Sequence, residues 1–190
     1  SLKESLIANK ISKIYGILNG TSNYILSSMD KQNKNFQDVL SIAKKLGYAE
    51  SNPSADVNGD DVSAKLKILS SLCFNSFLSD NIYVEGIKGI DTTDINNANK
   101  LGYKIKLLGF AELLNNNIYQ RVHPTLIKKN SYVASIDGVL NAVIIDGKPV
   151  GQSIIQGEGA GPAATTSALI SDISSILRGN IKFPFSVSSK

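Results

Sequence analysis

Two kinds of hydrophobic spacing follow one another along this 190-residue chain. In the first half, apolar residues at positions 36, 39, 40 and 43 recur at the spacing of one helix face, as do those at 62, 66, 69 and 72. The pattern predicts helices over Phe36–Leu46 and Asp61–Leu72. Gly47 stands where a left-handed residue commonly ends a helix, and Asn58 and Asp60 are candidate caps for the second helix.

Short strands are predicted for most of the second half. Segments rich in β-branched and aromatic residues alternate there with Asn, Gly and Pro, which favour turns. Asp146-Gly147 has the composition of a tight hairpin turn. The predicted strands are Lys104–Leu114, Ile118–His123, Ser131–Asp137, Asn141–Ile145 and Pro149–Ile155, with two earlier ones at Ile11–Leu18 and Ile82–Ile87.

The remaining segments complete the expected architecture. Further helices are predicted to begin within Tyr24–Met29, to cover Asp94–Leu101, and to run over Ala163–Leu177 up to Gly179. Tyr48–Asp56 contains an Asn-Pro pair and is expected to be a loop. With no repeat and no internal linker, this order predicts one α+β domain, a mixed β-sheet covered by helices.

Composition narrows the class of protein. The hydrophobic fraction is 42% and the charged fraction 19%, as in ordinary globular domains. The net charge of +4 comes from scattered lysines, without an arginine-rich helix, so we expect no nucleic-acid partner. No apolar run approaches the roughly 20 residues of a membrane helix. One cysteine and a polar start at Ser1–Lys10 favour a cytoplasmic location.

The densest group of chemically active residues lies between positions 47 and 65. Asp61 and Lys65 are four residues apart on one predicted helix face, within mutual reach. Glu50, on the preceding loop, could fold back beside them and complete a clamp for an ammonium group with a proton donor next to it. On spacing alone, such a pair is more commonly a solvated helix surface. Lys104 and Lys106 are expected on the exposed face of their strand.

Four sequence blocks carry a resemblance to a known family. The run GYAE–NP–ADVNGDD–SAK over residues 47–65 resembles the signature of homoserine dehydrogenases. Three more blocks are similar in the same order: Tyr15–Leu26, Gly138–Val143 and Gly157–Asp172. The resemblance runs from about residue 2 to 185. It implies the α+β fold of the homoserine dehydrogenase catalytic domain.

The resemblance also implies an activity and a set of roles. Homoserine dehydrogenases interconvert L-homoserine and L-aspartate 4-semialdehyde with NAD or NADP, in threonine, methionine and isoleucine biosynthesis. By that likeness Glu50 and Asp61 hold the amino acid, chiefly its ammonium. Lys65 is the catalytic residue that transfers the proton, and Thr21 and Tyr48 line the substrate pocket.

A glycine-rich loop is the implied cofactor contact. Gly157, Glu158, Gly159 and Gly161 lie near the end of the chain, too late for a dinucleotide-binding βαβ unit, and by resemblance cover the nicotinamide end of the cofactor. The family's N-terminal Rossmann domain is not found in these residues, so we expect little activity from the chain alone. Residues 1–185 are expected to form the catalytic, substrate-binding and dimerisation domain of a homodimer, residues 186–190 a tail or linker, and no metal ligand can be assigned.

Other interpretations stay open at this stage. The glycine-rich segment could be a structural helix entry. The chain could be a dimerisation or substrate-binding module without catalysis of its own. An unrelated lyase could use Lys65 as a Schiff-base nucleophile. The sequence decides neither the preference for NAD or NADP nor feedback by threonine.

Overall fold

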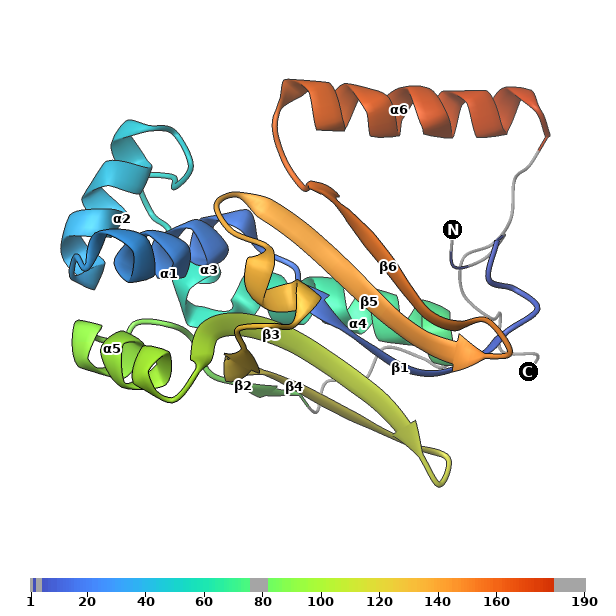
Figure 1. Ribbon diagram of the computed structural model, residues 1–190. Coiled ribbons are helices and arrows are strands. Elements are labelled where there is room, and N and C mark those ends of the chain that lie inside the picture. The colour runs from blue at the N-terminus through green and yellow to red at the C-terminus, as the bar shows by residue number, and fades with distance from the viewer. Residues whose placement is uncertain (1, 3–4, 76–81, 180–190) are drawn as a thin grey trace.

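A six-stranded mixed sheet forms the centre of the computed structural model, which describes residues 2, 5–75 and 82–179 (Figure 1). Its strand order is β2-β4-β3-β1-β5-β6. The strands are β1 (Lys10–Ile17), β2 (Tyr83–Val84), β3 (Tyr103–Leu114), β4 (Asn117–Lys128), β5 (Leu140–Lys148) and β6 (Gly151–Glu158). The helices are α1 (Gly20–Gln32), α2 (Phe36–Lys45), α3 (Ser54–Asn58), α4 (Asp60–Phe74), α5 (Thr92–Lys100), the 3₁₀ turn η1 (Tyr132–Ser135) and α6 (Pro162–Leu177).

Neighbouring strands run antiparallel, except for the parallel pair β2 and β4. The central strand β1 passes very close to β5 at Gly16, where an added Cβ would lie 2.0 Å from the carbonyl oxygen of Ala142. Only glycine fits at this point. The close pairing brings the last residues of β1 next to the first residues of β5 at one end of the strands, and α1 begins there.

The helices α1 and α4 cover one face of the sheet. Their inward side chains, among them Ile25, Met29 and Leu66, are fully or almost fully buried and form one core with Ile14 of β1. On the opposite face η1 packs over one end, where Val133 joins a smaller apolar cluster. Burial of this apolar surface is the main favourable contribution to folding, and it leaves the start of α1 at the rim of the core.

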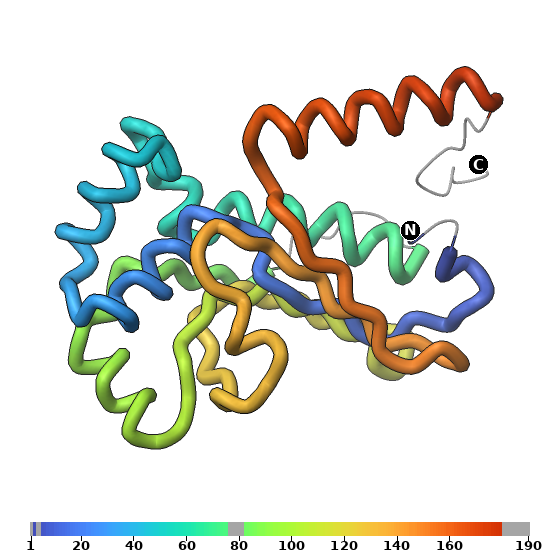
Figure 2. Tube along the Cα trace, turned by 45° about the horizontal axis from the view of Figure 1, so that its top comes forward, coloured from blue at the N-terminus to red at the C-terminus, as the bar shows by residue number. Residues whose placement is uncertain are grey.

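The last helix stands apart from this body. Figures 1 and 2 both show α6 separated from the sheet and joined to it through β6. It has no buried residue, and its large apolar side chains Leu169, Ile173 and Leu177 are 58%, 51% and 82% exposed. No helix among the described residues is long and apolar enough to span a membrane.

Most predicted elements are confirmed, and the mixed sheet covered by helices is the observed fold. The predicted helices at Phe36–Leu46, Asp61–Leu72 and Ala163–Leu177 correspond to α2, α4 and α6. Gly47 and Gly179 have the left-handed backbone expected after α2 and α6. The tail predicted at residues 186–190 lies outside the described residues.

Several local predictions are wrong. The helix expected to begin within Tyr24–Met29 begins at Gly20, directly after its cap Asn19. Ser131–Asp137 is no strand, because η1 forms there as a single turn that packs on the sheet. Asp146-Gly147 lies inside β5, and the hairpin turns two residues later, before the left-handed Gly151. The loop Tyr48–Asp56 ends early, because α3 begins at Ser54, whose amide and hydroxyl both donate to the side-chain oxygen of Asn52.

Two further corrections concern polar residues. Neither Asn58 nor Asp60 caps α4: the left-handed Gly59 stands at that position, and the helix start has no side-chain cap. Lys106, expected on an exposed face, is 1% exposed. A lysine tolerates such burial only when its ammonium group is fully hydrogen-bonded, and the partners of Lys106 are described below.

Candidate functional site

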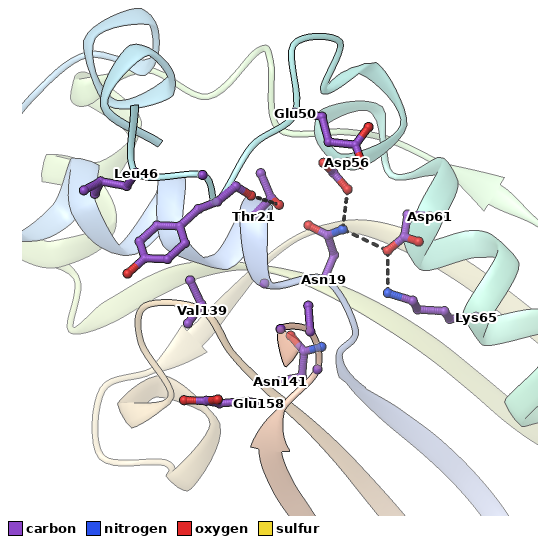
Figure 3. Close-up of a pocket in the computed structure, with 16 residues that line it drawn as sticks. Asn19, Thr21, Leu46, Glu50, Asp56, Asp61, Lys65, Val139, Asn141 and Glu158 are labelled. Atoms are coloured by element: carbon purple, nitrogen blue, oxygen red, sulfur yellow. Dashed lines mark hydrogen bonds and ion pairs between the residues drawn. The ribbon is translucent and has the colours of Figure 1, made fainter. Parts of the chain in front are cut away.

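The site is built around Asn19, which directly precedes α1 and lies two residues after β1. Its side-chain oxygen accepts a hydrogen bond from the backbone N–H of Ser22 at 2.8 Å and so caps α1. Its amide nitrogen donates to Asp56 at 2.7 Å and to Asp61 at 2.8 Å. One buried amide therefore joins the starts of α1 and α4 and the short helix α3, and it holds two carboxylates side by side (Figure 3).

Lys65 extends this chain of contacts by one group. Its ammonium nitrogen lies 2.7 Å from Oδ2 of Asp61 and 3.1 Å from the carbonyl oxygen of Leu18, to which it donates. A lysine ammonium has three N–H donors, so these two acceptors leave one donor for a ligand. The side chain is 46% exposed and lies at the wall of a cleft.

The cleft has a volume of about 590 Å³, large enough for an amino acid and part of a second ligand. Segments from distant parts of the sequence form its walls. The lining residues are Asn19, Gly20, Thr21, Leu46, Gly47, Tyr48, Glu50, Asp56, Asp61, Lys65, Val139, Asn141, Glu158, Gly159, Ala160 and Gly161.

Charge is unevenly distributed in the cleft. Figure 3 shows Glu50, Asp56 and Asp61 grouped on one side of it, with Lys65 beyond Asp61. Three carboxylates against one ammonium group leave this side with excess negative charge, which favours a cationic group of a ligand. Lys65 can at the same time donate to an oxygen atom of that ligand.

An aromatic wall closes the neighbouring part of the cleft. The hydroxyl of Thr21 donates to the backbone carbonyl of Tyr48 at 2.6 Å and fixes the loop after α2 against the start of α1. The ring of Tyr48 packs at 4.9 Å between centroids on Tyr24. Thr21 thus acts on the cleft through the position of Tyr48 as well as by lining it.

The structure brings most predicted site residues together. Lys65, Glu50, Asp61, Tyr48, Thr21, Glu158, Gly159 and Gly161 all line this one cleft. Gly157, which pairs with Asn141 within β6, does not line it.

Sequence reasoning missed Asn19, Asp56, Val139 and Asn141 as lining residues. A signal existed for Asn19, because an Asn between a buried strand and a helix is typical of a cap. Asp56 stood within the dense polar run but was not assigned a role. Asn141 lies in β5 and Val139 directly before it, and the pairing of β5 with β1 brings this segment to the end of β1 beside the cleft.

The glycine-rich loop has the shape expected beside a bound molecule. Gly161 precedes α6 with φ of 103°, and no atom lies within 4 Å of the position its Cβ would take. Gly159 packs on the Asn141 side chain so closely that a Cβ would lie 1.8 Å from its amide nitrogen. A flat ring could therefore approach the loop backbone. Among the described residues, no group of three or more His, Cys, Asp or Glu side chains could hold a metal ion.

Comparison with known proteins decides the family. The homoserine dehydrogenase family model matches residues 1–174. The chain belongs to the homoserine dehydrogenase family. The homoserine dehydrogenase of Neisseria gonorrhoeae is 45% identical over 179 residues, which are 94% of this chain and 41% of that protein. The Pseudomonas aeruginosa homoserine dehydrogenase is 42% identical over 185 residues, 97% of this chain and 43% of that protein.

Solved homoserine dehydrogenase structures share the fold. The crystal structure of a homoserine dehydrogenase from Thiobacillus denitrificans superposes with a TM-score of 0.92 at 43% identity, over 96% of this chain and 43% of the other. A hyperthermophilic archaeal homoserine dehydrogenase mutant in complex with NADPH superposes with a TM-score of 0.77 at 27% identity, over 93% of this chain and 51% of the other. The chain thus spans less than half the length of the curated relatives described above.

Proposed function

We propose that this chain is the substrate-binding and catalytic part of an NAD(P)-dependent homoserine dehydrogenase, which interconverts L-homoserine and L-aspartate 4-semialdehyde. The observation that carries the proposal is the ion pair of Lys65 and Asp61 in a cleft that the glycine-rich loop also lines. The pair places a proton donor next to a negatively charged site for an amino group.

The carboxylates position the substrate. The ammonium of L-homoserine binds between Glu50 and Asp61, with Asp56 adding negative charge nearby. Because the amide of Asn19 donates a hydrogen bond to one oxygen of Asp56 and to one of Asp61, the carboxylates keep their separation without a ligand. A preformed clamp of this kind lowers the entropy cost of binding. Tyr48 and Thr21 form the wall that orients the rest of the amino acid.

Lys65 handles the proton. When bound, NAD or NADP supplies or accepts the hydride at the C4 carbon of the substrate. As the aldehyde is reduced, negative charge develops on its oxygen, and the remaining N–H of Lys65 stabilises that charge and donates the proton. In the reverse direction the same nitrogen receives the hydroxyl proton. Asp61, at 2.7 Å, orients the ammonium group toward the cleft.

The glycine-rich loop faces the reactive end of the cofactor. Glu158, Gly159 and Gly161 line the cleft beside Lys65, and the side-chain-free backbone allows close approach of a nicotinamide ring. Gly157 lies in β6, the strand that leads into this loop, and its pairing with Asn141 fixes where the loop begins. The NADPH complex of the archaeal relative supports NADP as one cofactor of this family.

The second part of the proposal concerns assembly. Residues 1–185 form one catalytic and dimerisation domain, and 186–190 a linker, in a cytoplasmic homodimer. A sheet face opposite α1 and α4 supports the dimer: the cross-strand neighbours Tyr15, Phe110 and Arg121 line it, and the Arg121 guanidinium lies 4.2 Å from the centroid of the Phe110 ring. Analytical ultracentrifugation of wild type and Phe110→Glu checks this, and equal monomer fractions would contradict it.

Binding of the substrate tests the main proposal. We expect the chain to bind L-homoserine and, much more weakly, its analogue 4-hydroxybutyrate, which lacks only the ammonium group. Isothermal titration calorimetry measures both. The chain alone should show little dehydrogenase activity, and addition of a separately expressed nucleotide-binding domain should restore homoserine-dependent reduction of NAD(P). Equal affinity for both compounds would contradict the carboxylate clamp.

A Schiff-base lyase is the less favoured function, because the chain belongs to the homoserine dehydrogenase family and Lys65 is tied to Asp61. Borohydride treatment in the presence of L-aspartate 4-semialdehyde should leave no covalent adduct on Lys65. Mass spectrometry of the tryptic peptides shows the adduct if the lyase mechanism is correct.

A further inference from the structure

Lys106 of β3 is a buried lysine outside the cleft. Its ammonium nitrogen reaches four acceptors, two of them on α1: Oδ1 of Asn23 at 3.0 Å and the hydroxyl of Ser27 at 3.3 Å. The other two follow η1: the carbonyl oxygen of Ile136 at 2.6 Å and Oδ1 of Asp137 at 2.7 Å. A single side chain of the sheet therefore connects α1 to the segment that leads into β5.

Asn23 makes a second connection between the same two parts. Its amide nitrogen donates to the carbonyl oxygens of Ile136 at 3.2 Å and Leu140 at 3.1 Å. The side chain is 1% exposed, and its oxygen is the acceptor for Lys106. Segment 136–140 is thus fixed to α1 at both of its ends.

This segment forms part of the cleft. Val139 lies between the two fixed ends and lines the cleft beside the start of α1. Its carbonyl oxygen lies so close to Gly20 that a Cβ there would be 2.7 Å away. A shift of segment 136–140 would move this wall relative to Thr21, the next residue of α1.

The positive charge of Lys106 is paired with the carboxylate of Asp137, which belongs to the same segment. Burial lowers the pKa of Lys106, and the hydrogen bond to Asp137 opposes that effect. Asp137 also accepts contacts from Lys31 at 3.0 Å and Lys104 at 3.3 Å, on its other oxygen. A buried ion pair adds little net stability compared with apolar residues, but it requires a defined geometry. Such a pair is suited to holding two segments in register.

We propose that Lys106 is a positioning residue: it holds segment 136–140 against the first turns of α1 and thereby sets the Val139 wall of the substrate cleft. The link to substrate rests on the function proposed above, whereas the link to the segment does not. Lys106 itself lines no part of the cleft and takes no part in proton transfer.

Lys106→Met and Lys104→Met provide a matched test in the 190-residue chain. Both lysines lie on β3 and contact Asp137, and Lys104 also lies 3.9 Å from Asp30 near the end of α1. Only Lys106 donates to Ile136 and to the first turns of α1. Hydrogen–deuterium exchange should become at least about tenfold faster at 136–140 in Lys106→Met and change less than about twofold in Lys104→Met. The dissociation constant for L-homoserine should rise by about tenfold in the first variant alone.

Met29→Ala separates positioning from loss of stability. Met29 is fully buried in the main core and lines no part of the cleft. At a temperature well below unfolding, it should leave both the homoserine affinity and exchange at 136–140 close to wild type. Equal weakening of binding in Met29→Ala and Lys106→Met would overturn the proposal.

Two other results would also overturn it: unchanged exchange at 136–140 in Lys106→Met, or faster exchange with unchanged affinity. A wild-type chain that does not bind L-homoserine would contradict the proposed substrate site. In that case the exchange measurement alone decides whether Lys106 holds the segment.

Discussion

Two lysine–aspartate pairs in this protein have the same separation and very different surroundings. Lys65–Asp61 and Lys106–Asp137 both have a closest N–O distance of 2.7 Å. The side chains of the first pair are 46% and 30% exposed, and those of the second 1% and 18%. Distance alone therefore says little about what an ion pair does.

The difference lies in the remaining hydrogen-bonding capacity. Lys106 has four acceptors for three N–H donors, so nothing is left for a ligand. Lys65 has two acceptors and lies on a cleft. An incompletely paired ammonium group in a polar cleft can act on a substrate, whereas a completely paired one in the core can only hold structure. Substitutions should separate these two roles.

The largest effect on stability is expected for Lys106→Met. It breaks the buried ion pair and removes the Lys106 donor from Oδ1 of Asp137 and from Oδ1 of Asn23, so the free energy of unfolding should fall by about 3–5 kcal/mol. Urea denaturation followed by circular dichroism measures the change. A loss under about 1 kcal/mol would show that the buried pair does not hold α1 to the sheet.

Asp61→Asn should act chiefly on binding. Removal of the carboxylate charge takes away a charged contact to the substrate ammonium worth about 2 kcal/mol, so L-homoserine should bind roughly 30-fold more weakly. Stability should change by less than about 1 kcal/mol, because the pair with Lys65 is exposed. Asp60→Asn, on the same helix turn but outside the cleft, is the matched control. Equal losses of affinity in the two variants would contradict the assignment.

Asn19 both stabilises the fold, as the cap of α1, and positions the carboxylates of the cleft. Two substitutions can separate these roles. Asn19→Ala removes the cap of α1 and should lower the free energy of unfolding by about 1–2 kcal/mol. Asn19→Asp keeps the oxygen that caps α1 but places a third carboxylate against Asp56 and Asp61. The affinity for L-homoserine should therefore change more than the contribution of the cap to the free energy of unfolding. Calorimetric titration and urea denaturation of both variants measure the two quantities. Identical behaviour of the two would contradict a shared cap and site function.

The smallest effect is expected for the dependence of stability on pH, below about pH 4. Burial would raise the pKa of Asp137, but hydrogen bonds from Lys106 and Lys31 hold it below the ordinary value of 3.8. A carboxyl group with a lowered folded-state pKa stabilises the fold above its unfolded pKa and loses this contribution as pH falls. The stability difference between wild type and Asp137→Asn should thus be constant above about pH 5 and shrink below about pH 4. A difference independent of pH would contradict the ionised pair.

The local pattern of apolar residues predicts helices and strands well where that pattern follows the burial of one face of the element. The helices α2, α4 and α6 and the long strand β3 were found because their periodicity is regular. The turn of the β5–β6 hairpin was misplaced, because pairing to β1 extends β5 past Asp146-Gly147. Such pairing comes from distant strands and leaves no local signal.

The site could be predicted only through the family signature. Spacing placed Asp61 and Lys65 on one helix face, but it left them indistinguishable from a solvated pair. The contacts that change this interpretation, from Asn19 and the carbonyl of Leu18, are 42 and 47 residues away in sequence. Lys106 was misjudged for a related reason: its partners lie on α1 and after η1, so the pattern of its own strand could not show that it is buried.

Activity after reconstitution tests the central claim most directly. Lys65→Met and Lys88→Met each remove one lysine, and the exposed Lys88 lines no part of the cleft. Each variant is combined with a nucleotide-binding domain. Homoserine-dependent reduction of NAD(P) is then followed by the absorbance of the reduced nicotinamide. Lys65→Met should lose activity by roughly 10²- to 10⁴-fold with stability changed by less than about 1 kcal/mol, and Lys88→Met should match wild type. Near wild-type turnover by Lys65→Met would remove Lys65 from the mechanism and contradict the account.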